Sequence, residues 1–128
     1  MDGIIGGENS GPLTPDPVPS GVIAAGEGLL ATDLAATAAM GFDPLQLRLY
    51  KNLLQDPYFR YEINEVGQVN VLSNVPEWNG DVANLARTSL GFRPHPGWIG
   101  EIEWKRGRNR SRVQLAEARQ EVPSSRVS

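Results

Sequence analysis

The sequence predicts an α/β fold, with a partial sheet and helices packed against it. Residues 21–42 carry most of this prediction, because an apolar run, a glycine turn and an alanine-rich stretch follow one another there. The apolar run Val22 to Ala25 is bounded by glycines, which is typical of a strand covered on both faces. Leu29 to Met40 contains strong helix formers and no breaker, and Gly41 is suited to end that helix. We expect the helix to be apolar nearly all round and buried on most sides.

The chain divides into three parts. Residues 1–20 form a glycine- and proline-rich loop, residues 21–104 an α/β unit, and residues 105–128 a polar tail. Four glycines and four prolines in the first part predict that neither a helix nor a central strand runs far, so we interpret it as a flexible lead. The tail contains few apolar residues and is predicted to be disordered.

Two more helices are predicted inside the α/β unit. Asp43-Pro44 opens the first as N-cap and N1 residues, and Pro57 ends it. Its apolar positions cover over half the circumference, which predicts that this helix belongs to the core; they are Leu45, Leu47, Leu49, Tyr50, Leu53 and Leu54. The second helix is expected over Asp81 to Leu90, with Val82, Leu85, Ala86 and Ser89 facing inward.

Short strands complete the predicted unit. Phe59 to Glu62 and Val69 to Leu72 indicate a small β unit around Gly67, followed by a loop over Pro76 to Gly80. Side chains alternate between two faces from Trp98 to Trp104, which predicts a last half-buried strand.

Composition narrows the classes of function. The chain has 128 residues and a net charge of −3, and its basic run from Lys105 to Arg112 is typical of a solvated tail, so nucleic-acid binding is not expected. There is no cysteine, which excludes disulfides, thiolate zinc sites and iron–sulfur clusters ligated by thiolates of this chain. No apolar run approaches the ~20 residues of a membrane span, and Met1-Asp2 is unlike a basic signal-peptide start. We therefore expect a cytoplasmic protein without a membrane anchor.

Asp33 is the first candidate site residue. It is the only charge on the alanine-rich helix, and a carboxylate on such a helix is costly unless it is paired, hydrogen-bonded or beside a solvent-lined cleft. The alternative is an ordinary exposed acid near the first turn, where the helix dipole favours it. Both interpretations stay open at this point.

Three further residues complete the predicted ligand-binding set. Asp2 and Glu8 flank glycines that let backbone amides approach a ligand, although neither a phosphate-loop pattern nor GxGxxG is present. If this loop meets Asp33, the oxygens would suit a hard cation such as Mg²⁺ or a polar substrate. His95, the only histidine, is a candidate acid, base or ligand, with a surface or packing role as the alternative. No nucleophile–base pair can be assembled, so the reaction type, the catalytic residues and the cofactor stay unassigned.

Three segments together resemble the C-terminal part of the domain of unknown function 362 family. They are Asp2-Gly3-Ile4-Ile5-Gly6 with Gly11-Pro12, then GVIAAG…TDLAATAAMGFDP, then FRPHPGWIGEIEW, and they span roughly residues 2 to 104. Family members are longer, so the resemblance implies that this chain is a fragment of a larger α/β domain. Many members are described as iron–sulfur proteins because of cysteine motifs elsewhere, none of which this chain has. The family has no settled activity.

The chain departs from the family pattern at two places, which weakens any transfer of the family's activity to it. Two classes of function stay open. Gly28-Leu29 replaces a typical Asp-Pro, and Glu101 stands where a histidine is expected. Under one hypothesis, the chain is part of a ligand- or metal-binding, redox-associated domain. Its cleft would lie at the strand ends and be lined by Asp2, Glu8, Asp33 and His95. The other is a non-catalytic fragment, truncated or dependent on a partner. That partner would be a chain supplying the missing N-terminal half, or a second copy.

Overall fold

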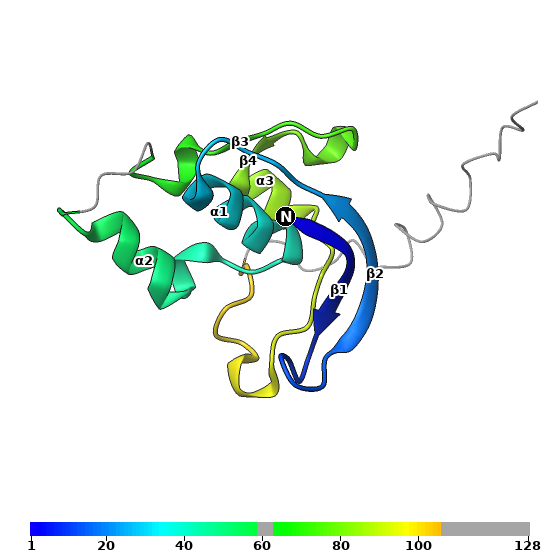
Figure 1. Ribbon diagram of the computed structural model, residues 1–128. Coiled ribbons are helices and arrows are strands. Elements are labelled where there is room, and N and C mark those ends of the chain that lie inside the picture. Colours follow the sequence, from blue (N-terminus) through cyan, green and yellow to red (C-terminus); the bar gives the residue numbers. More distant parts are fainter. Residues whose placement is uncertain (59–62, 106–128) are drawn as a thin grey trace, which may run out of the picture.

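A β-hairpin opens the chain. In the computed structural model, which describes residues 1–58 and 63–105, β1 (Asp2–Glu8) pairs antiparallel with β2 (Asp16–Ile23), and the two form a curved ribbon along one side of the molecule (Figure 1). The expectation of a flexible lead is therefore wrong. Both strands of a two-stranded sheet are edge strands. Proline is tolerated in an edge strand because the outer edge of that strand has no partner and so needs no N–H donor. This explains how β2 contains Pro17 and Pro19.

The alanine-rich helix forms as predicted. α1 runs over Leu29–Met40 and ends at Gly41, whose φ of 98° is a left-handed conformation that glycine adopts without strain. The N–H of Gly41 donates to the carbonyl of Ala38 at 2.9 Å, which closes the last turn. One face is buried, with Leu30 and Leu34 at its centre, but Leu29 is almost fully exposed. The helix is therefore covered on fewer sides than its composition predicts.

The strand before α1 differs from the prediction. β2 begins six residues earlier than Val22 and ends at Ile23. It is not covered on both faces, because Ile23 is 75% exposed. β2 also pairs only with β1, so its other edge carries no further strand of the described residues.

The second helical region is interrupted. Asp43 caps a short 3₁₀ turn by accepting a hydrogen bond from the N–H of Leu45 at 3.0 Å, as predicted. Leu47 then takes an extended conformation, and α2 (Arg48–Gln55) begins after it. This change of direction leaves Leu45 and Leu49 47% and 62% exposed. The prediction that the whole segment belongs to the core is wrong, since α2 has no fully buried residue.

A small second sheet precedes the third helix. β3 (Asn70–Val71) pairs antiparallel with β4 (Gly80–Asp81), and a 3₁₀ turn over residues 76–78 lies in the connection that was predicted as a loop. The predicted strand over residues 59–62 lies outside the described residues. α3 (Val82–Arg87) is capped by Asp81 and ends three residues before Leu90, because the N–H of Thr88 already closes the last turn. Val82, Leu85 and Ala86 are buried as expected, and Ser89 is half-buried.

Residues 92–104 form an irregular strap. A 3₁₀ turn over Pro96–Trp98 and the positive φ of Gly100 bend the backbone where a strand was predicted. Only an isolated bridge between Phe42 and Glu103 remains of the expected pairing, so that prediction is wrong. Ile102 is nevertheless buried.

Two apolar clusters form the core of this mixed α/β fold. The larger joins α1, α3, Val69 and Trp78, and the smaller joins Val18, Phe42, Phe92 and Ile102. The hairpin approaches the smaller cluster closely, because a Cβ on Gly6 would lie 2.5 Å from Cζ of Phe92. Among the described residues, no helix is long and apolar enough to cross a membrane.

Candidate functional site

An open groove of about 910 Å³ lies beside α1. One wall is the segment from Gly21 to Glu27, which continues β2 toward the helix, and the other is formed by residues 68–75 around β3. Figure 1 shows the chain after β2 running toward α1 past the region of β3 and β4. The volume is within the range of ligand-binding clefts.

Alanines of α1 form the floor of this groove. Ala31, Ala35 and Ala39 follow each other at intervals of four residues and therefore lie on one side of the helix, with Ala36 beside them. The short side chains leave the space above the helix open. Trp78 and Leu85 also line the cavity and belong to the larger apolar cluster.

The polar side chains of the groove are neutral or acidic, and the amino group of Met1 adds one positive charge. Carboxylates come from Glu27 and Glu77, both exposed, and the remaining polar side chains are amides and hydroxyls: Thr32, Gln68, Asn70, Ser73, Asn74 and Thr88. The amino group of Met1 donates to the carbonyl of Ala24 at 2.7 Å. No lysine, arginine or histidine side chain among the described residues lines this cavity. The carboxylates of Glu27 and Glu77 against the one ammonium of Met1 leave the groove with a net charge of −1, which favours a cationic occupant.

A smaller cavity of about 220 Å³ lies at the other end of the hairpin. Glu8 at the end of β1 lines it and is only 5% exposed. Its two carboxylate oxygens accept hydrogen bonds from Nε and the backbone N of Arg93, at 2.8 and 2.9 Å. The guanidinium also donates to Asp16 across the hairpin at 3.1 Å. The Glu8 carboxylate is thus occupied by structural hydrogen bonds.

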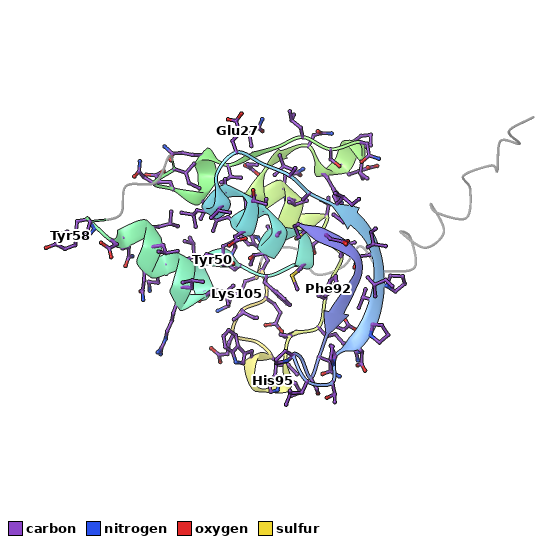
Figure 2. The ribbon with its side chains drawn as sticks, in the orientation of Figure 1. Glu27, Tyr50, Tyr58, Phe92, His95 and Lys105 are labelled. Carbon is purple, nitrogen blue, oxygen red and sulfur yellow. The ribbon has the colours of Figure 1, made fainter. Side chains whose placement is uncertain are left out.

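His95 lines the same small cavity from the strap. Its ring is exposed, and Nδ1 accepts a hydrogen bond from the N–H of Gly97 at 3.2 Å. A neutral ring with an accepting Nδ1 has its proton on Nε2, so this atom can donate to a ligand. Figure 2 shows His95 at the opposite end of the molecule from Glu27, so the two cavities are separate.

The four predicted ligand-binding residues do not line one cavity. Glu8 and His95 share the small cavity, whereas Asp2 and Asp33 line neither of the two. Asp2 accepts a hydrogen bond from the N–H of Ile4 at 3.0 Å, and Asp33 is exposed on α1. In the part of the chain that the structure describes, no group of three or more His, Asp or Glu side chains is placed to hold a metal ion.

Sequence reasoning missed the groove and the role of Arg93. The alanines spaced by four residues along α1 were a usable signal, because a helix face without large side chains leaves room for another chain or a ligand. Arg93 gave no signal, since its partner Glu8 is 85 residues away.

Comparison with protein-family models, curated proteins and solved structures gave no match. The resemblance to the domain of unknown function 362 family therefore stays a prediction.

Proposed function

We propose that this chain is a non-catalytic, partner-dependent binding domain whose groove beside α1 is the binding surface. The observation that carries the proposal is the groove itself: a cavity of about 910 Å³ with a floor of alanines and walls that include the end of β2 and all of β3. Such a surface supplies shape and apolar contact, and among the described residues its titratable side chains are two exposed carboxylates, Glu27 and Glu77.

Large apolar side chains at the rim support the same conclusion. Ile23 and Leu72 both line the groove, from opposite walls, and are 75% and 85% exposed. Exposed apolar side chains grouped around a concave surface mark interaction sites. A bound partner would remove both from water, at about 25 cal/mol for each Å² of apolar surface buried.

A second candidate function rests on the small cavity. Glu8 and His95 line it together, as expected for part of a ligand-binding, redox-associated domain of the kind the family resemblance implies. His95, Trp98 and Arg93 are exposed side chains there that a ligand could contact. We place this function second because Glu8 already accepts two hydrogen bonds from Arg93. The cytoplasmic location stays a prediction.

The groove can be tested with Nile red, an uncharged dye that fluoresces in apolar surroundings. Ala36 lines the groove, and Ala36→Leu places a larger side chain in it. Ala83 on α3 is a matched control, because it is also a half-buried helical alanine but lines neither cavity. Dye affinity should fall about tenfold in Ala36→Leu, since the added side chain occupies space the dye needs. Ala83→Leu should bind as the parent does.

Circular dichroism establishes that both variants are folded. If folded Ala36→Leu bound the dye as tightly as the parent protein, or if the parent did not bind it, the groove would not be the binding surface.

A further inference from the structure

We propose that the occupant of the groove is an extended polypeptide segment of a partner protein, with small apolar residues flanked by lysine or arginine, that adds as a strand to the outer edge of β2. This inference rests on the proposed function, because it names the class of partner for the same groove. Strand addition is a common mode of peptide recognition, in which the backbone gives affinity and alternate side chains give specificity.

The hydrogen-bonding pattern of the hairpin supplies the first argument. Met1 and Ala24 exchange two hydrogen bonds, with N–O distances of 2.7 and 3.0 Å. In an antiparallel pair, bonded and non-bonded residue pairs alternate, so the next pair, Asp2 and Ile23, directs its N–H and C=O groups away from the partner strand. Ile23 therefore presents a backbone donor and acceptor on the edge of β2 that β1 does not cover. Pro17 and Pro19 remove N–H donors from the earlier part of this edge, so the part that can pair with another chain is the part around Ile23.

The shape of the groove supplies the second argument. Its walls are two runs of consecutive residues, 21–27 and 68–75, so backbone as well as side chains borders the space between them. The floor from Ala31 to Ala39 spans about 12 Å at 1.5 Å per helical residue. That length corresponds to about four residues of an extended strand at 3.3 Å each. Small side chains on the inserted strand would meet the alanines.

Charge complementarity identifies the flanks of the segment. Glu27 is on one wall and Glu77 follows the other. Among the described residues of the groove, only the ammonium of Met1 offsets one of these two negative charges. Lysine or arginine beside the apolar residues would pair with these carboxylates. A nucleic acid or an acidic peptide would be repelled by the same groups.

The probe is a synthetic peptide, Lys-Ala-Val-Ala-Val-Lys, acetylated, amidated and labelled with rhodamine, titrated with the full chain by fluorescence anisotropy. Three comparisons are needed: the same peptide with glutamate in place of lysine, the same peptide with N-methylated alanines, and the variant Glu27→Gln/Glu77→Gln. Each should weaken binding by about tenfold, through lost charge pairing or lost backbone donors. Glu101→Gln is the control, because Glu101 is exposed and lines neither cavity.

Two results would overturn the inference. The first is no binding of the lysine peptide, or equal binding of its N-methylated form. The second is self-association of the unliganded chain through the groove, seen as a dimer in light scattering that Ala36→Leu abolishes, which would make a second copy the occupant. If the lysine peptide fails while Nile red still binds and Ala36→Leu still blocks it, the strand inference falls and the proposed binding surface stands.

Discussion

At the scale of single residues, the ion pair of Glu8 and Arg93 joins the N-terminal hairpin to the strap. Arg93 donates to Glu8 at the end of β1 and to Asp16 at the start of β2, so one side chain clamps both strands of the hairpin. Asn9 adds a backbone hydrogen bond to the carbonyl of Arg93 at 3.0 Å. The two carboxylates differ in surroundings, because the Glu8 side chain is 2% exposed and that of Asp16 is 53% exposed.

Glu8→Gln should lower the free energy of unfolding by about 2 kcal/mol, because hydrogen bonds to a buried charged acceptor are stronger than those to a neutral amide, and one amide position cannot accept. Asp16→Asn, its exposed counterpart on the same guanidinium, should cost less than about 1 kcal/mol. Urea denaturation followed by tryptophan fluorescence measures both. Equal losses in the two variants would contradict the assignment of Glu8 as the principal partner.

The contrast between Asp33 and Glu8 shows what sequence alone can predict about site residues. Asp33 stands out because its neighbours along α1 are apolar, yet whether a helix position faces water depends on what packs against it, and Asp33 is exposed. Glu8 was noticed only for its place near glycines. Its burial depends on Arg93, and a contact between residues 85 positions apart has no local signature.

At the scale of elements, the two ends of α1, the cap Asp43 and a strand at β3 were predicted, whereas the end of α3, the break before α2 and the pairing of β1 with β2 were not. The ends of α1 and the caps Asp43 and Asp81 depend on residues within one turn, so their chemistry is readable locally. β1 required a partner 21 residues away, since Asp2 pairs with Ile23. The strand expected at residues 98–104 had the right alternation but acquired no neighbour beyond one bridge. A strand exists only where another chain segment supplies its hydrogen bonds.

The value of such a cap can be tested by comparing Asp81, the N-cap of α3, with Asp33, an exposed residue within α1. Asp81 accepts a hydrogen bond from the N–H of Asn84 at 2.6 Å at the start of α3, so Asp81→Ala should lower the free energy of unfolding by about 1 kcal/mol. Asp33→Ala should instead raise it by a few tenths, about 0.3 kcal/mol, because alanine has the higher helix propensity. Thermal melts of both variants beside the parent measure the difference. A large loss in Asp33→Ala would show that its carboxylate has a structural or ligand-binding partner after all.

At the scale of the whole molecule, the two apolar clusters are joined by Leu90. This half-buried side chain packs against both clusters, and its N–H donates to the carbonyl of Ala39 at 2.8 Å. The hairpin and the strap connect to the helices there, and also through Val22 and Trp104, which pack against the larger cluster. Leu54 on α2 offers a comparison, because it is also half-buried but packs only against the larger cluster.

Leu90→Ala should lower the free energy of unfolding by about 2 kcal/mol, the low end for truncating a leucine in a core, since the side chain is only half-buried. Hydrogen exchange should show faster exchange on both sides of the junction, at the amide of Thr88 after α3 and at the amide of Phe92, which donates to Met40 at 2.8 Å. In Leu54→Ala, the larger change should stay within α2, whose packing is the weaker. If Leu90→Ala accelerated exchange in one cluster only, Leu90 would not couple the two clusters.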